Sequence, residues 1–178
     1  MRRTKVWDPL VRIFHWSLAG VFIANAIAVD PDARLHQTLG YVALGLVVFR
    51  VLWGLIGARH ARFSDFPPSL TAAIGQIGEV ATGRVRHHLG HTPLGALMIY
   101  NLLGTLVLIA LSGWLMTTDA FWGQEWPEEF HEIMVTWAEA SVVIHVAAVI
   151  FESMRSRVNL PLSMITGYKN LPDTTQRP

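Results

Sequence analysis

The chain has 178 residues, of which 52% are hydrophobic and only 15% are charged. Soluble domains carry about 25% charged residues, so this composition argues against an ordinary soluble domain. A net charge of +1 offers no field that would recruit nucleic acid, and the absence of cysteine excludes disulfides, thiolate metal sites, iron–sulfur clusters and covalent haem attachment. Any metal chemistry therefore rests on the eight histidines and the carboxylates.

Four apolar stretches, each nearly free of charge, follow one another along the chain. They cover about residues 13–29, 36–56, 93–116 and 131–151. Each is long enough to cross a hydrocarbon core of about 30 Å as a helix, and the alternation that a membrane barrel requires is missing. The sequence predicts an all-α integral membrane protein with four transmembrane helices. These form a single domain over residues 1–171, followed by a polar tail at residues 172–178.

The N-terminus permits a second interpretation. Three basic residues in the first five positions precede an apolar run that ends in Ala26-Ile27-Ala28, as in a cleavable signal peptide. However, Asp8-Pro9 and Arg12 separate the basic start from the apolar run, and cleavage would leave three spans. We therefore expect the first stretch to remain as a transmembrane helix.

The basic residues outside the predicted spans are distributed unevenly. They lie before the first span (Arg2, Arg3, Lys5, Arg12), between the second and third (Arg59, Arg62, Arg84, Arg86) and after the fourth (Arg155, Arg157, Lys169, Arg177). The other two loops contain Arg34 together with the acidic residues Asp30, Asp32, Asp119, Glu125, Glu128 and Glu129. By the positive-inside rule, both termini and the linker at residues 57–92 are predicted to be cytoplasmic, and the acidic loops face the other side.

The cytoplasmic linker is predicted to contain a short surface helix over residues 70–82, with Ser69 as its N-cap. Four histidines lie in or beside this linker: His60, His87, His88 and His91. We interpret them as solvated loop residues or membrane-surface contacts, because no metal site can be assembled from them.

Ionisable side chains within spans are costly and usually functional, which directs attention to His15, His36, His131 and His145. A lone histidine of this kind is more often a hydrogen-bonded packing residue, but four in one small bundle favour a shared role. His131 and His145 are fourteen residues apart, or close to four helical turns, so their imidazoles face nearly the same way. His15 begins the first span at its inner end, whereas His36 begins the second at its outer end. We predict that His15 meets His145 and that His36 meets His131.

Two histidines on different helices at one depth are suitable axial ligands for haem b, which needs no cysteine attachment and fits an apolar slot between helices. A zinc ion fits less well, because two histidines leave tetrahedral coordination unfinished. Ligation by two histidines fills both axial positions of the iron, which predicts electron transfer rather than oxygen binding. The alternative of a haem-free membrane scaffold requires the matched depths to be a coincidence.

Short motifs along the chain also carry a resemblance to a known family. They are Trp7-Asp8-Pro9-Leu10-Val11-Arg12-Ile13-Phe14-His15-Trp16, His36-Gln37-Thr38-Leu39-Gly40-Tyr41, Gly90-His91-Thr92-Pro93-Leu94-Gly95, His131-Glu132 with His145, and Met164-Ile165-Thr166-Gly167-Tyr168-Lys169. Together they resemble the bacterial dihaem cytochromes b of the cytochrome b561 type, which include the membrane cytochrome subunits of nickel–iron hydrogenases. The resemblance implies a four-transmembrane-helix bundle in the inner membrane that encloses two b-type haems held by the four histidines.

Three arginines are further candidates for binding these haems. Arg50 lies near the inner end of the second span and is a candidate partner for a propionate of the inner haem, although a lipid-facing, snorkelling arginine is the alternative. Arg12 and Arg34 are similar candidates for the inner and outer haem. Glu139, eight residues after His131, is expected to be a neutral acid hydrogen-bonded to Asn25 or Asn101, with proton conduction as the alternative.

The predicted function is electron relay between an outer haem at His36 and His131 and an inner haem at His15 and His145. Quinone is one expected partner, and the acidic loop at residues 119–130 offers a docking surface for a basic periplasmic cytochrome or a membrane-attached redox subunit. Some relatives with this haem arrangement oxidise superoxide and reduce quinone, which is the alternative. Acidic outer loops disfavour the approach of that anion.

Overall fold

The computed structural model describes residues 2–86 and 88–171. Four long helices form its body: α1 (Pro9–Ile23), α2 (Arg34–Ile56), α4 (Pro93–Leu115) and α5 (Trp126–Ser156). A π-helical turn, η1 (Ala24–Ala28), continues α1. The predicted polar tail at residues 172–178 and His87 lie outside the described residues.

All four long helices, with α1 extended by η1, are long and apolar enough to span a membrane, with mean hydropathies of 1.5, 2.1, 2.2 and 1.9 in chain order. This confirms the predicted four-helix membrane fold. Within each span's most apolar window, only 11–17% of the residues are buried inside the chain. Most of each span is therefore left to contact lipid or a bound group.

The helices begin and end at residues that cap them, and these end positions differ from the edges of the apolar stretches. The first helix starts at Pro9 rather than residue 13, because the Asp8 carboxylate accepts hydrogen bonds from the backbone N–H of Leu10 and Val11. The fourth span continues past both ends of residues 131–151, from Trp126 to Ser156. Hydropathy located the spans but not their caps.

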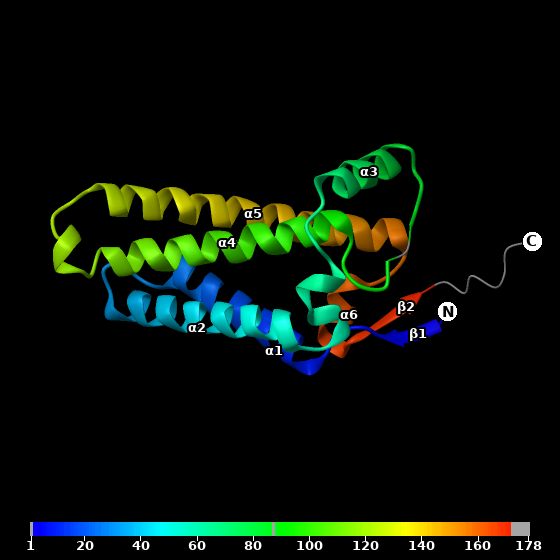
Figure 1. Ribbon diagram of the computed structural model, residues 1–178, viewed down its shortest axis with the longest axis horizontal. Helices are drawn as coiled ribbons and strands as arrows, with labels where there is room; N and C mark the ends of the chain where they lie inside the picture. Colours follow the sequence, from blue (N-terminus) through cyan, green and yellow to red (C-terminus); the bar gives the residue numbers. More distant parts are fainter. Residues whose placement is uncertain (1, 87, 172–178) are drawn as a thin grey trace, which may run out of the picture.

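One end of the bundle gathers most of the remaining regular structure (Figure 1). This end holds α3 (Leu70–Ala81), α6 (Leu160–Thr166) and the strands β1 (Arg2–Lys5) and β2 (Tyr168–Leu171), which pair antiparallel with Lys5 opposite Tyr168. The short 3-10 helices η2 (Arg59–Ala61) and η3 (Phe63–Asp65) precede α3, and η4 (Asp119–Phe121) lies between α4 and α5. The loops between α1 and α2 and between α4 and α5 occupy the opposite end. We call these the termini end and the loop end.

The pairing of β1 with β2 was not predicted, and it joins the two ends of the chain. The backbone N–H groups of Val6 and Trp7 donate to the Gly167 carbonyl at 2.9 and 3.1 Å, and the Trp7 indole donates to Ser163. Gly167 has a left-handed φ of 87°, and a Cβ there would lie 2.9 Å from the Trp7 carbonyl oxygen. Only glycine suits this position.

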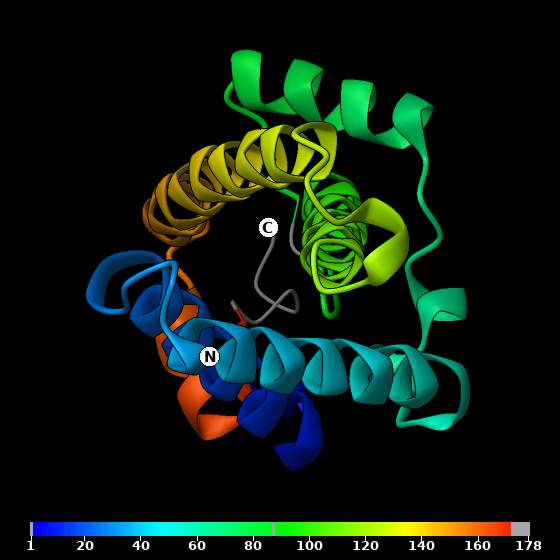
Figure 2. The ribbon, with the colours of Figure 1, turned by 90° about the vertical axis from the view of Figure 1, so that its left-hand side faces the viewer.

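Viewed along the bundle, α1 and α2 lie on one side and α4 and α5 on the other (Figure 2). The α4–α5 contact uses small residues such as Ala138, which is fully buried. It also contains a polar network, in which Asn101 donates to Ser141 and accepts from the Trp137 indole, each at 2.9 Å. Lipid tails are as apolar as the side chains, so the hydrophobic effect does not drive association of the helices. Close packing of small residues and hydrogen bonds hold α4 and α5 together instead.

The predicted linker helix is confirmed as α3. The Ser69 hydroxyl accepts from the Ala72 N–H at 3.2 Å and caps it. The Gln76 side chain is buried and accepts from the Leu94 N–H at 2.9 Å, which ties α3 to the first turn of α4. The helix therefore lies outside the four-helix bundle, beside α4 and α5 (Figure 2).

Candidate functional site

The structure brings the four span histidines together as two pairs on facing helices. The ring centres of His15 on α1 and His145 on α5 are 6.4 Å apart. Those of His36 on α2 and His131 on α5 are 6.2 Å apart. Because His131 and His145 are separated by about 21 Å of helix rise, the two pairs lie at two depths of the bundle.

These separations can be compared with the geometry of a metal held between two imidazoles. A bond of about 2.05 Å from each nitrogen to one metal, plus about 1.1 Å from that nitrogen to its ring centre, separates two opposed ring centres by about 6.3 Å. The observed 6.4 and 6.2 Å are close to this value. A direct imidazole hydrogen bond or ring stack would bring the rings closer. The residues present therefore fit axial ligation of a haem b by a pair of histidines.

The hydrogen bonds around His131 leave its Nε2 free to be a metal ligand. Its Nδ1 lies 3.0 Å from the Ile109 carbonyl oxygen and 3.0 Å from the Ser112 hydroxyl. Donation from Nδ1 to the carbonyl leaves Nε2 with its lone pair free for a metal, as hydrogen bonds to the other ring nitrogen of a ligating histidine do in metal sites. Gly113 permits this arrangement, because a Cβ there would lie 3.3 Å from Cε1 of His131.

The other histidines are less constrained by the chain. The buried Nδ1 atoms of His15 and His36 have no hydrogen-bond partner among residues 2–86 and 88–171. Buried polar atoms are nearly always paired, so an orphaned imidazole needs an explanation. Ligation of a metal would fix both rings. Over the same residues, no group of three or more His, Asp or Glu side chains converges as a site for a bare metal ion.

Arg50 lies on the same side of α2 as His36, since fourteen residues again make close to four turns. It is only 3% exposed, and its guanidinium lies 5.0 Å from the centre of the Phe63 ring. Its buried Nη1 has no hydrogen-bond partner within the described parts of the chain. The snorkelling alternative for Arg50 is therefore wrong, because this cation is enclosed by protein.

The two remaining arginine candidates lie in different surroundings. Arg12 donates a hydrogen bond to the Ile165 carbonyl and packs against Gly167, so its guanidinium fastens the C-terminal segment to α1. Its Nε is buried without a partner among the described residues. Arg34 is the exposed first residue of α2, at the loop end. The structure shows a structural role for Arg12 and assigns no contact to the Arg34 side chain.

The expected partners of Glu139 are wrong. The Asn101 amide is occupied by Ser141 and Trp137, and the buried Asn25 Oδ1 has no hydrogen-bond partner in the described part of the chain. Glu139 itself is exposed on α5. Asn101 does contact α5 near Glu139, but Ser141 and Trp137 take its hydrogen bonds.

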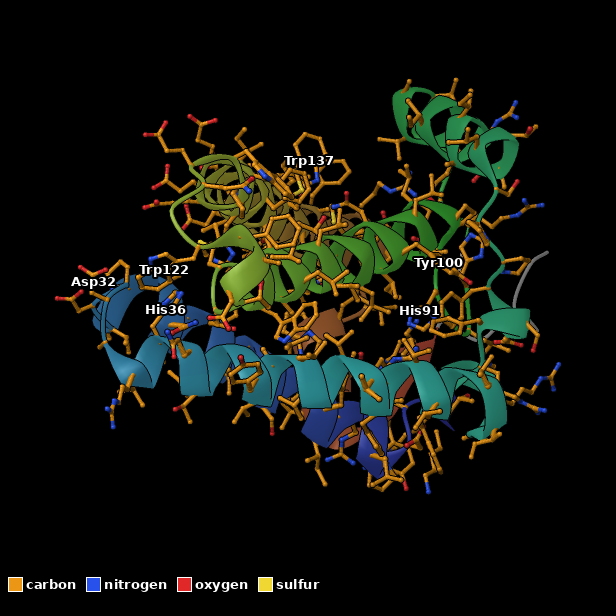
Figure 3. The ribbon with its side chains drawn as sticks, turned by 60° about the vertical axis from the view of Figure 1, so that its left-hand side comes forward. Asp32, His36, His91, Tyr100, Trp122 and Trp137 are labelled. Carbon is orange, nitrogen blue, oxygen red and sulfur yellow. The ribbon has the colours of Figure 1, made fainter. Side chains whose placement is uncertain are left out.

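The interpretation of His91 as a solvated residue is also wrong. Its ring lies between Trp7 and Phe66, with ring centres 4.7 and 4.2 Å away, and burial lowers the pKa of His91 to about 3. Figure 3 shows it with Tyr100 towards one end of the bundle, while His36, Asp32 and Trp122 lie at the other. Its place in the motif Gly90-His91-Thr92-Pro93, directly before α4, was the available signal.

Two other linker histidines, His60 and His88, make polar contacts at the termini end. His60 pairs with Asp65 at 2.8 Å, and the His88 carbonyl accepts from the Lys169 ammonium at 3.3 Å. Lys169 also donates to the Gly90 carbonyl at 2.8 Å and is only 5% exposed. Burial lowers the pKa of Lys169 to about 8, against a smaller opposing effect of Glu152. These contacts join β2 to the linker.

Membrane-spanning helices that present paired histidines to one another define a membrane-bound cytochrome. The comparison with family models agrees: the model described as "Prokaryotic cytochrome b561" matches residues 6–167, and the chain belongs to this family. The family establishes a multi-pass membrane protein that binds haem b and transfers electrons.

Curated relatives support the same assignment. A protein of Cupriavidus necator named "Probable Ni/Fe-hydrogenase B-type cytochrome subunit" is 23% identical, over 97% of this chain and 89% of its own length. A protein of the same name from Rhizobium leguminosarum bv. viciae is 24% identical, over 94% and 89%. One from Rhodobacter capsulatus is 23% identical, over 97% and 84%. No solved structure matches the chain.

Proposed function

We propose that the chain binds two haems b, one between His15 and His145 and the other between His36 and His131, and relays electrons between the quinone pool and a redox partner. The observation that carries this proposal is the pair of ring separations, 6.4 and 6.2 Å, each suited to one iron between two imidazoles. A bound haem b exchanges a single electron, and two axial histidines leave no open position for oxygen.

The chain's own residues hold and shield these sites. His131 is oriented by the Ile109 carbonyl, and the largely apolar faces of α1, α2, α4 and α5 surround the interior. A dry, apolar shell excludes water and controls the redox potential of a bound metal. Two pairs at two depths suit electron transfer across the bilayer rather than along its surface.

Arg50 is proposed to hold a propionate of the inner haem. A buried cation without an ion-pair partner is unfavourable, and among the described residues no carboxylate forms a salt bridge with it. Arg50 lies on the same side of α2 as His36 and four turns further along the helix, which places it at the level of His145. A carboxylate of the bound group would supply the missing charge.

Orientation follows from the charges at the two ends. The termini end carries most of the basic residues, and the loop end carries the acidic residues Asp30, Asp32, Asp119, Glu125, Glu128 and Glu129. The positive-inside rule therefore favours cytoplasmic termini in a bacterial inner membrane. The pair His36–His131 is then periplasmic and His15–His145 is cytoplasmic.

The loop end is proposed to dock the redox partner. The relatives are named as hydrogenase cytochrome subunits, which favours a membrane-attached redox subunit or a periplasmic cytochrome. The acidic loops favour a partner with a basic face, and Trp122, at 81% exposure, supplies an apolar contact among them (Figure 3). Oxidation of superoxide is less well supported, since negative charge at this end repels the anion.

A spectroscopic assay with different donors tests the relay. The reduced-minus-oxidised difference spectrum of the purified protein should show b-type bands. These bands should appear rapidly when a quinol or a reduced basic cytochrome c is added as the electron donor. Reversing Glu128 and Glu129 to lysine should slow the cytochrome reaction and weaken its salt dependence, while reduction by quinol is unchanged. Faster reduction by superoxide than by every other donor would favour the alternative and contradict this proposal.

A further inference from the structure

A surface hollow of about 520 Å³ lies at the termini end, where α5 gives way to α6. It is lined by Ile150, Ser153, Met154, Arg157, Asn159 and Pro161. Its floor belongs to the last turns of a membrane-spanning helix, where Met154 is 76% and Ile150 53% exposed. The hollow therefore begins on a lipid-facing surface and ends at a polar rim.

The polar rim consists of groups that suit an anion. No salt bridge in the described parts of the chain includes Arg157. The side-chain Oδ1 of Asn159 accepts from the Leu162 N–H at 2.9 Å, which orients the side chain so that its amide N–H groups remain as donors. A guanidinium and an amide donor beside one another are a common means of binding a phosphate.

The backbone at Arg157 gives an independent indication that its side chain is needed. Arg157 ends α5 in the left-handed conformation, with φ 56° and ψ 27°, and it is the only described non-glycine residue with positive φ. Glycine is the favoured residue at this position of a helix end, because other residues are strained there. Arg157 therefore occupies a backbone position that favours glycine and lines the hollow, which points to a role for its charge.

We propose that this hollow binds an anionic phospholipid of the surrounding leaflet, with its phosphate on Arg157 and Asn159 and an acyl chain along Ile150 and Met154. The occupant must combine a long apolar part with a negative head, because the floor is apolar and continuous with the span while the rim is cationic. Basic pockets at the ends of transmembrane helices bind anionic lipid head groups for the same reason. This site lies apart from the histidine pairs and does not depend on the proposed relay.

The test uses the complete, haem-loaded protein in a zwitterionic detergent. Phosphatidylglycerol, phosphatidylcholine and inorganic phosphate are added separately, and binding is followed by native mass spectrometry and by the melting temperature. Phosphatidylglycerol should bind and raise the melting temperature, whereas phosphatidylcholine and inorganic phosphate should have little effect. An equal response to inorganic phosphate, or to phosphatidylcholine, would overturn the proposal of an anionic lipid.

Two variants separate the charge from the fold. Arg157→Gly removes the guanidinium and relieves the left-handed strain, so it should fold at least as well as the parent without lipid. Its affinity for phosphatidylglycerol should be about five-fold weaker, the contribution of one arginine near an anionic membrane surface. Arg62→Gln removes an exposed arginine of the same end and should leave the affinity unchanged. Unchanged binding in Arg157→Gly, or equal loss in both variants, would contradict the assignment.

Discussion

Replacement of Arg50 by glutamine is expected to affect the haem-free and haem-loaded proteins in opposite directions. In the chain alone, Arg50 is a cation at 3% exposure that lies 5.0 Å from the centre of the Phe63 ring and forms no salt bridge with a described carboxylate. A desolvated cation–π contact contributes about 2 kcal/mol, less than the several kcal/mol that desolvation of an ion costs. Arg50→Gln should therefore leave the haem-free protein as stable as the parent or more stable.

The haem-loaded protein should respond differently. Loss of one partner of a buried charge pair costs about 3–5 kcal/mol, which corresponds to roughly a hundred-fold to several thousand-fold weaker retention of the inner haem. Arg50→Lys keeps the charge without the planar fork and should retain more haem than Arg50→Gln. Haem dissociation to apomyoglobin and thermal unfolding of both forms measure the two effects. Equal haem retention in parent and Arg50→Gln, or a strongly destabilised haem-free variant, would refute the reasoning.

Three further changes test other parts of the account. Gly113→Ala should move His131, whose Cε1 would lie 3.3 Å from the new Cβ, and should weaken outer-haem retention by about ten-fold. Equal haem loss at both sites would contradict this prediction. Gly167→Ala should lower the free energy of unfolding by more than the roughly 1–2 kcal/mol of left-handed strain, because the new Cβ would lie 2.9 Å from the Trp7 carbonyl oxygen. Gly83→Ala is the control with left-handed strain alone, because Gly83 has φ 71° and no atom near its Cβ position. Because burial lowers the pKa of Lys169 from 10.5 to about 8, the folded state binds fewer protons than the unfolded state between these values, so stability in detergent should rise by about 3 kcal/mol across that window. A Lys169→Met variant should lose this rise, and an unchanged pH profile in that variant would show that another group causes it.

The sequence predicted the membrane fold because hydropathy acts over whole spans. Runs of apolar residues with few charges identify helices regardless of how they pack, and spacing on α5 indicates that His131 and His145 face one way. The helix caps at Asp8 and Ser69 are local signals and could also be read from the chain. The Asp8 cap lies five residues before the apolar run, so hydropathy alone does not indicate it.

Long-range contacts could not be predicted in the same way. The burial of His91 between Trp7 and Phe66 requires the N-terminus and the linker to meet at the termini end, and the local motif around His91 does not indicate which residues enclose it. The sequence alone permits both an enclosed and a lipid-facing Arg50, because the enclosure of Arg50 depends on Phe63 from the linker. The expected partners of Glu139 were wrong because Ser141 and Trp137, also on α5, form hydrogen bonds with the Asn101 side chain.

The number of haems per chain, with their axial ligands, tests the central claim most directly. Haem quantitation by the pyridine haemochromogen method, combined with near-infrared magnetic circular dichroism, should give two low-spin haems with bis-histidine ligation in the parent. His145→Ala should lose one of them and keep the haem between His36 and His131, and His36→Ala should do the reverse. A colourless parent protein, a single haem, or two bis-histidine haems retained in His145→Ala would contradict the account.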